Sequence, residues 1–192
     1  MNAVTALIAT LNRLPLREGQ QREIIRGLAE KFPFGETDGR SAALKVQDEK
    51  SGALTLTFSK FAMRDGKISG CIDIRYPVCV VLEDVVAGLS AALEQAGVHY
   101  GRNMEEKPHI VPEDSEFVQK LLRVYSEVEG EPGCCIAIGG GTYVHTVEGG
   151  VAFGVERGNT DYHMHGNDEF ITEEELLKDA VLFACAIVDI CG

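Results

Sequence analysis

Residues 53–75 alternate between apolar and polar side chains with a period of two, and a turn signal divides the alternation in half. Leu56 and Phe58 alternate with threonines and a serine before the turn, and isoleucines alternate with polar residues after it. Asp65 and Gly66 form the Asp-Gly pair that is typical of tight hairpin turns. The pattern predicts an antiparallel β-hairpin with one apolar face. The rest of the fold must cover that face.

Helical periodicity flanks the hairpin on both sides. Pro15 and Pro33 end two helices before it, and Gly97 is a suitable C-terminal cap for a third helix after it. The order helix, hairpin, helix, strand is most of a ferredoxin-like unit that lacks its first strand. We assign residues 1–107 to this incomplete domain. The expected elements are helices over residues 4–14, 20–31 and 82–95 and a short strand over residues 98–103.

The second half of the chain has a different pattern. Residues 104–112 carry charges and two prolines and are predicted to form a linker. Thr172 and Glu175 form a capping box that opens the last helix. These features predict an α/β segment over residues 108–192, so the whole chain is classed as α+β. The expected elements are helices over 114–129 and 173–190, a strand buried on both faces over 134–138, a second strand over 151–155 and a polar loop over 156–168.

Composition excludes several classes of function. The 192 residues carry a net charge of −12, which would repel a nucleic-acid backbone. No apolar run reaches the roughly 18 residues that a membrane span requires, and the N-terminus does not resemble a signal peptide. The six cysteines include no Cys-x-x-Cys pair, which favours reduced thiols in the cytosol. We therefore expect a cytoplasmic protein without nucleic-acid or membrane partners.

Three consecutive glycines, Gly139, Gly140 and Gly141, follow the apolar run at 134–138. Their backbone can approach a ligand closely, and their N–H groups can cradle an anion. A tight turn is the simpler local explanation. Their spacing is not that of a dinucleotide-binding or phosphate-binding loop, which argues against a nucleotide.

Two histidines in the polar loop form a second candidate. His163 and His165 lie beside Asp161 and Asp168 just before the capping box. A His-x-His pair near acids can bind a transition metal, whereas two solvated histidines are the simpler alternative. A zinc site needs three or four ligands, and the sequence offers no obvious second cluster.

Arg75 is the third candidate, because it ends the second strand of the predicted hairpin. An arginine in that position can clamp a carboxylate through two parallel hydrogen bonds. The common alternative is an exposed arginine paired with a nearby acid.

Taken in order, these motifs resemble the C-terminal end of bacterial dipeptidase V. That enzyme is an Xaa-His dipeptidase of the zinc-dependent exopeptidase superfamily, which also contains aminoacylase and carnosinase. Segments 72–77 and 107–112 resemble the lid of the same family and its link to the catalytic domain. The motifs that carry the resemblance are Gly139-Gly140-Gly141-Thr142, Gly150-Val151-Ala152-Phe153-Gly154 and His165-Gly166-Asn167-Asp168-Glu169.

The resemblance implies a metallo-dipeptidase that hydrolyses short peptides with a free C-terminus, using two zinc ions. By motif, His165 is the last zinc ligand, Arg75 is the lid arginine that grips the substrate carboxylate, and Gly139, Gly140 and Gly141 line the substrate pocket. No stretch matches the N-terminal zinc ligands, the general-base glutamate or the lid histidine. The chain is therefore expected to be a fragment that binds no zinc stably, contains no catalytic residue and is inactive without the missing N-terminal half.

Two alternatives remain open at this point. The chain could be a non-catalytic module that binds a small amino acid or mediates dimerisation. The lid of several members of the superfamily mediates homodimers, so the resemblance also allows a homodimer here.

Overall fold

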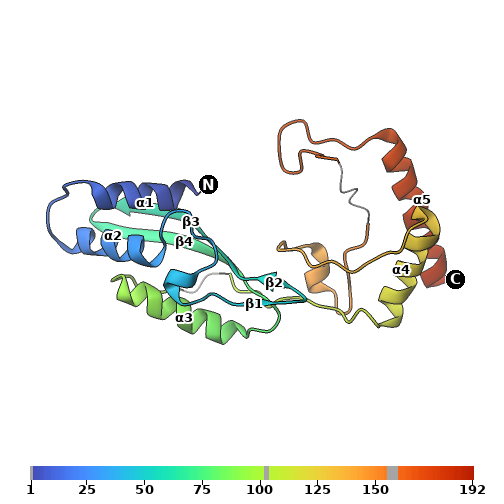
Figure 1. Ribbon diagram of the computed structural model, residues 1–192, viewed down its shortest axis with the longest axis horizontal. Coiled ribbons are helices and arrows are strands. Elements are labelled where there is room, and N and C mark those ends of the chain that lie inside the picture. The colour runs from blue at the N-terminus through green and yellow to red at the C-terminus, as the bar shows by residue number, and fades with distance from the viewer. Residues whose placement is uncertain (1, 102–103, 155–159) are drawn as a thin grey trace. The chain divides into compact units, whose positions relative to one another are not determined.

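The computed structural model describes residues 2–101, 104–154 and 160–192, which divide into two compact units (Figure 1). The first unit extends to His109 and also contains Ala137–Gly139. The second unit contains Ile110–Ile136 and Gly140–Gly192. Each unit has its own hydrophobic cluster, so each is described by itself.

The described residues of the first unit form three α-helices, one short 3-10 helix and two small antiparallel sheets. The predicted hairpin is confirmed, with Thr55 opposite Arg75 at its open end and Arg64 opposite Lys67 at its turn. Three of the predicted helices are confirmed as α1, α2 and α3. The elements are α1 (Ala3–Arg13), α2 (Gln20–Lys31), the short 3-10 helix η1 (Arg40–Ala42), β1 (Gln47–Asp48), β2 (Gly52–Ala53), β3 (Thr55–Arg64), β4 (Lys67–Arg75) and α3 (Leu82–Gln95).

One face of the β3–β4 hairpin forms the core of the first unit with the three helices (Figure 1). Leu56 and Phe58 of β3 are buried, whereas the threonines on either side of Leu56 are exposed. This alternation is the one that the sequence predicts. The helices contribute buried residues to the same cluster, namely Ile8 of α1, Leu28 of α2 and Leu89, Ala92 and Leu93 of α3.

Asn2 fixes the start of α1 against the hairpin. Its Oδ1 accepts hydrogen bonds from the backbone N–H groups of Val4 and Thr5, at 2.8 and 3.0 Å. Its Nδ2 donates to the carbonyl oxygen of Phe58 in β3, at 3.0 Å. One side chain therefore caps the helix and ties it to the strand.

Gly70 of β4 lies where the hairpin has no room for a side chain. A β-bulge interrupts the register between Phe58 and Lys60. A Cβ atom added at Gly70 would lie 2.6 Å from the carbonyl oxygen of Lys60 and 2.6 Å from Cε2 of Phe58. The close approach of β3 therefore explains why position 70 is a glycine and not a residue with a side chain.

We expect Gly70→Ala to lower the free energy of unfolding by roughly 1–3 kcal/mol, because backbone and a buried ring must both shift. Urea denaturation followed by circular dichroism measures the change. Gly101→Ala is the matched control, because a Cβ atom at Gly101 meets nothing within 4 Å. Equal stability of the two variants would contradict the explanation.

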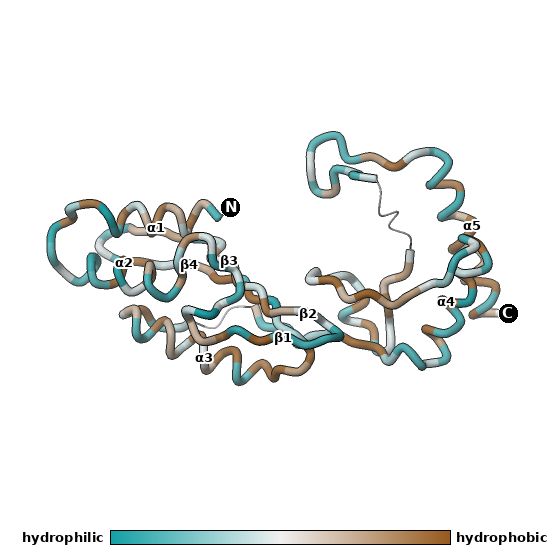
Figure 2. Tube along the Cα trace, in the orientation of Figure 1, coloured by the Kyte–Doolittle hydropathy of each residue, from teal (hydrophilic) through white to brown (hydrophobic). Residues whose placement is uncertain are grey.

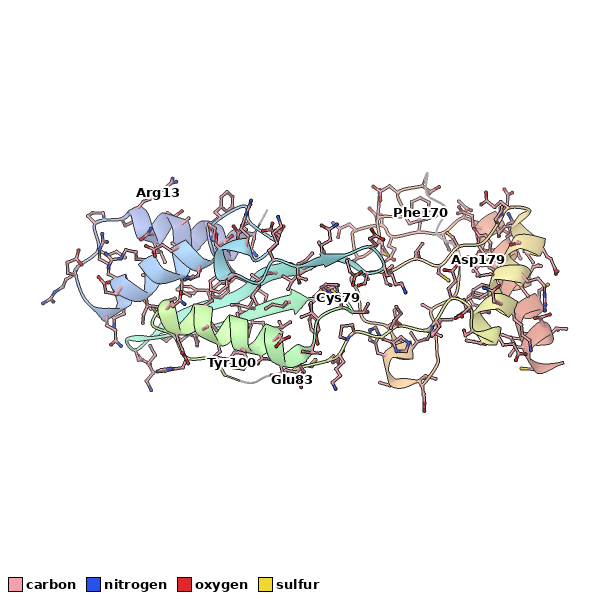
Figure 3. The ribbon with its side chains drawn as sticks, turned by 60° about the horizontal axis from the view of Figure 1, so that its bottom comes forward. Arg13, Cys79, Glu83, Tyr100, Phe170 and Asp179 are labelled. Carbon is pink, nitrogen blue, oxygen red and sulfur yellow. The ribbon has the colours of Figure 1, made fainter. Side chains whose placement is uncertain are left out.

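The Asp48 carboxylate connects the β1–β2 turn to the segment before α3. It accepts hydrogen bonds from the backbone N–H groups of Lys50, Ser51 and Cys79, at 2.8, 2.5 and 3.3 Å. It also accepts from the Ser51 hydroxyl at 2.8 Å, and that hydroxyl accepts from the N–H of Val78 at 3.0 Å. Figure 3 labels Cys79 in this segment. The hydrogen bonds from Ser51 are the largest cause that lowers the pKa of Asp48 to about 2.

The lowered pKa of Asp48 predicts acid-sensitive stability. Its value is about 2 in the folded chain against an ordinary 3.8, so the folded state favours the carboxylate. This stabilisation is fully present when the pH is above the pKa of Asp48 in the unfolded chain. It is lost as the pH falls toward the lower pKa of Asp48 in the folded chain. The melting temperature of the wild type should therefore exceed that of Asp48→Asn at pH 6. The difference between the two melting temperatures should shrink between pH 4 and pH 2. A difference that is independent of pH would contradict this role.

The second unit is built on two helices and a short 3-10 turn. They are α4 (Glu116–Glu129), η2 (Tyr143–Thr146) and α5 (Glu173–Cys191). The prediction placed the start of α4 two residues early, because Ser115 is its N-cap and accepts a hydrogen bond from Val118 N–H. Leu121 and Val124 of α4 pack against α5. The helices are also joined by ion pairs, from Arg123 to Asp189 and from Lys178 to Glu129.

Three further predicted strands are not observed in the part of the chain that the structure describes. Residues 134–138 form no strand, and Ile136 and Ile138 are 70% and 58% exposed, so the expectation of a strand buried on both faces is wrong. A strand needs a partner for its backbone N–H and C=O groups, and none pairs with this segment among the described residues. Residues 98–101 and 151–154 are also without strand structure, and the remaining positions of those two predictions lie outside the described residues.

No helix in the described part of the chain is long and apolar enough to cross a membrane.

Candidate functional site

Arg75 is the last residue of β4, at the open end of the hairpin. Its Nε lies 3.4 Å from Oδ1 of Asp73, and both side chains are 55% exposed. An exposed ion pair of this length contributes little to stability. The alternative considered from the sequence, an exposed arginine paired with a nearby acid, is therefore observed. This pairing leaves much of the guanidinium accessible to another anion.

Gly139 lies beside Arg75 within the first unit. A Cβ atom at Gly139 would lie 3.8 Å from Cδ of Arg75, which is ordinary van der Waals distance. The structure thus brings together two candidate residues that are far apart in the sequence. A side chain longer than alanine at Gly139 would compete with the arginine for space.

The glycine run leaves its backbone donors available. In the described residues, the N–H groups of Gly139, Gly140 and Gly141 have no hydrogen-bond partner within the protein. None of the three has a positive φ, so backbone conformation does not require glycine there. The run leads into η2, whose first turn is capped by Thr142 and His145. These observations favour an open stretch of donors over a strained tight turn.

His165 lies in a compact loop that the sequence shows only as polar. The loop closes where the Phe170 N–H donates to the carbonyl oxygen of Tyr162 at 3.2 Å, and the two rings lie 5.8 Å apart. The His163 ring meets the Phe170 ring edge-on at 5.9 Å. Figure 3 labels Phe170 at this closure. In the sequence, the signal for this closed loop was the pair of aromatic residues, Tyr162 and Phe170, on either side of the turn residues.

The loop is anchored to the start of α5. The Tyr162 hydroxyl donates to Oε1 of Glu175 at 2.6 Å. Oε2 of Glu175 accepts from the Thr172 N–H at 3.2 Å, and the Glu175 N–H donates to the Thr172 hydroxyl at 3.2 Å. The predicted capping box is therefore confirmed, and the same glutamate also holds the loop.

Left-handed backbone is concentrated in this loop. His163, His165 and Asp168 have φ values of 56°, 61° and 58°. Two other non-glycine residues in the described part of the chain have positive φ, Ala43 and Asp65. Such conformations cost energy and often mark functional positions. The fold therefore holds the exposed His165 in an unfavourable backbone conformation.

His165 alone cannot hold a metal ion. The described residues contain no group of three or more His, Cys, Asp or Glu side chains placed to bind one. Zinc in proteins takes three or four protein ligands. His165 can supply one imidazole, and any further ligands must come from outside the described residues.

Cys79 and Cys135 do not supply an activated nucleophile. Desolvation, followed by the hydrogen bond and charge of Asp48, raises the pKa of the Cys79 thiol. Desolvation and the charge of Glu113 raise the pKa of the Cys135 thiol. A raised pKa lowers the fraction of reactive thiolate at neutral pH. These two residues are therefore poor candidates for catalysis.

The chain is similar to bacterial proteins that carry dipeptidase names. It is 31% identical over 191 residues to “Putative dipeptidase YtjP” of Bacillus subtilis, covering 99% of this chain and 40% of that protein. It is also 31% identical over 194 residues to “Beta-Ala-Xaa dipeptidase” of Lactobacillus delbrueckii subsp. lactis, covering 98% and 40%. No family model matches the chain.

The similarity extends over this whole chain but over less than half of each relative. A dipeptidase-named protein of Staphylococcus aureus strain USA300 shows the same pattern, at 26% identity over 193 residues, with 100% of this chain and 40% of the relative covered. The chain thus spans about 40% of the length of the curated relatives it matches.

Proposed function

We propose that this chain is the substrate-clamping and C-terminal part of a zinc dipeptidase that hydrolyses short peptides with a free C-terminus. The similarity to dipeptidase-named proteins over 98–99% of the chain supports peptide hydrolysis as the reaction class. The remaining metal ligands and the general base belong to the part of the protein that the chain does not span. This chain then contributes binding groups rather than catalytic ones.

The observation that carries the proposal is the position of Gly139 beside Arg75. A carboxylate can accept two hydrogen bonds from one guanidinium and further ones from backbone N–H groups. Arg75 is only loosely held by Asp73, and the N–H groups of the glycine run lack protein partners among the described residues. Arg75 and the N–H group of Gly139, which belong to the same unit, would together recognise the C-terminal carboxylate of a peptide.

His165 is the proposed zinc ligand of the chain. Its ring is exposed and its backbone is fixed by the loop closed at Tyr162 and Phe170. A bound zinc ion would lower the pKa of its water to about 7 and polarise the peptide carbonyl. A single imidazole does not bind such an ion stably, so two zinc ions require the ligands of the missing part.

A non-catalytic amino-acid-binding module is the weaker proposal. It would use the same arginine and glycine N–H groups, but it explains neither the left-handed His165 nor the relatives' names. The two proposals differ in whether zinc and the rest of the protein are needed.

We expect the isolated 192-residue chain to show no dipeptidase activity, because the described residues offer no metal site. The measurement is release of the C-terminal amino acid from a β-alanyl dipeptide in the presence of zinc. The comparison is a hybrid in which this chain replaces the matched region of the Lactobacillus relative, which supplies the missing part. Chelator-sensitive turnover by the chain alone would contradict the proposal.

A further inference from the structure

The outer edge of β3, which faces away from β4, carries two backbone groups without a protein partner. The Leu56 N–H on this edge donates to the carbonyl oxygen of Thr37 at 2.7 Å. Two residues further on, the Phe58 carbonyl oxygen accepts from Nδ2 of Asn2 at 3.0 Å. The groups between these two hydrogen bonds are the Leu56 carbonyl oxygen and the Phe58 N–H. Neither has a hydrogen-bond partner in the part of the chain that the structure describes.

Both groups belong to residues that are almost completely buried. Leu56 is 5% exposed and Phe58 is 4% exposed. Nearly all buried backbone N–H and C=O groups in folded proteins have a hydrogen-bond partner, and each exception needs an explanation. A donor and an acceptor left side by side on one strand edge therefore indicate a place where a small polar molecule can bind.

A cavity of about 350 Å³ in the first unit lies at this position. Leu56 and Phe58 line it together with residues from the start of α1, the end of α2 and the loop that follows α2. Hydrophobic residues recur along α1, α2 and β3 (Figure 2). A cavity of this volume, with apolar walls and a few fixed polar groups, is typical of a small-molecule site.

Two charged side chains of opposite sign also line the cavity, Lys31 and Glu36. The half-buried Lys31 has no ion pair or hydrogen bond with any described residue. The Glu36 carboxylate accepts from the N–H and the hydroxyl of Ser41, both at 2.8 Å, so its position is fixed. A molecule that carries both an ammonium group and a carboxylate is therefore suited to the charges of the cavity.

The spacing of the two backbone groups matches one amino-acid unit. In a parallel pairing, one extended residue donates its N–H to the carbonyl oxygen before the facing residue and accepts from the N–H after it. With Thr57 as the facing residue, these groups are the Leu56 carbonyl oxygen and the Phe58 N–H. Both bonds then come from a single α-amino-acid unit.

We propose that this cavity binds one α-amino-acid unit in extended form, either a free amino acid or one residue of a peptide. The unit pairs with Leu56 and Phe58, and Lys31 attracts the carboxylate when the amino acid is free. The outer edge of β3 faces away from β4, the strand that ends at Arg75. The site is therefore separate from the proposed carboxylate clamp and does not depend on the proposed function.

Hydrogen exchange at single amides tests the proposal in the isolated chain, with L-leucine and acetyl-L-leucinamide as the probes. At a probe concentration ten times its Kd, exchange of the Phe58 N–H should slow about tenfold, because the bound unit accepts its hydrogen bond. The Thr57 N–H faces β4 and is the matched control, so its exchange should not change. Unchanged exchange of the Phe58 N–H with both probes would overturn the proposal.

The two probes also distinguish the two sources of the unit. Acetyl-L-leucinamide presents the N–H and C=O of a peptide residue without charge, whereas L-leucine carries both charges of a free amino acid. Tighter binding of L-leucine assigns the site to a free amino acid, and tighter binding of acetyl-L-leucinamide assigns it to a peptide residue.

β-Leucine, an isomer of L-leucine, tests the proposed pairing. Its amino group lies one carbon further from the carboxylate, so it cannot form both hydrogen bonds in the same extended geometry. Its Kd should therefore be about tenfold higher than that of L-leucine. Equal Kd values for the two isomers would overturn the proposal.

Three variants locate the bound amino acid. Lys31→Gln should raise the Kd of L-leucine about fivefold and leave that of acetyl-L-leucinamide unchanged, because only L-leucine has a carboxylate. Lys67→Gln, at an exposed position beside the hairpin turn, is the matched control and should change neither Kd. Arg75→Ala should leave the protection of the Phe58 N–H intact. Loss of that protection in Arg75→Ala would assign the binding to the carboxylate clamp and overturn the proposal.

Discussion

Replacing His165 with alanine in the hybrid should abolish dipeptide hydrolysis. The proposed role of His165 is to supply a zinc ligand, and the metal contributes several kcal/mol of charge stabilisation. At about 1.4 kcal/mol per tenfold change in rate, its loss corresponds to at least roughly a thousandfold lower kcat/KM. Initial rates with a β-alanyl dipeptide measure the effect, and metal analysis of the purified protein should show less bound zinc.

His163→Ala is the matched control for this experiment. His163 is exposed, lies in the same loop and also has a left-handed backbone, but its ring packs against Phe170. We expect this variant to retain activity within about threefold, since no metal ligand is removed. If His165→Ala keeps its activity and its zinc, His165 is not a ligand and the proposed metal role is wrong.

Replacing Arg75 with alanine should lower kcat/KM by about 10–100-fold, mainly through a higher KM. The guanidinium is proposed to hold the substrate carboxylate, and hydrogen bonding to a charged group contributes about 1.5–3 kcal/mol, which corresponds to this loss. Arg75→Lys keeps the charge but loses the geometry that allows two parallel hydrogen bonds. Its kcat/KM should therefore lie between the values of the wild type and of Arg75→Ala. Steady-state kinetics of the hybrid distinguish the three proteins.

A dipeptide with a C-terminal amide tests which substrate group Arg75 recognises. The wild-type hybrid should prefer the free acid over the amide, and Arg75→Ala should lose that preference. Asp73→Asn is the control. Oδ1 of Asp73 lies 3.4 Å from Nε of Arg75, but Asp73 is not proposed to touch the substrate. An undiminished preference for the acid in Arg75→Ala would exclude the clamp.

The sequence was sufficient where structure depends on neighbouring residues. The Asp65-Gly66 turn and the alternation around Phe58 specify the hairpin locally, and both are observed. The capping box at Thr172 and Glu175 also acts within one turn of helix. Residue propensities and hydrophobic periodicity predict structure reliably when the residues that determine it are close together in the sequence.

The sequence was insufficient where structure depends on distant partners. The apolar run at 134–138 has strand composition, but a strand forms only beside another strand, and no described segment pairs with it. The position of Gly139 beside Arg75 brings together residues distant in the chain, and the left-handed backbone of His165 occurs in a loop closed by Tyr162 and Phe170. Motif spacing alone could not show either arrangement.

Hydrolysis of a β-alanyl dipeptide by the hybrid is the most direct test of the central claim that this chain completes a zinc dipeptidase. The hybrid should be stripped with a chelator, assayed, reloaded with zinc and assayed again, next to the isolated chain under the same conditions. We predict activity that the chelator removes and zinc restores, with none in the isolated chain. A folded, zinc-loaded hybrid without activity, or activity that the chelator does not affect, would contradict the claim.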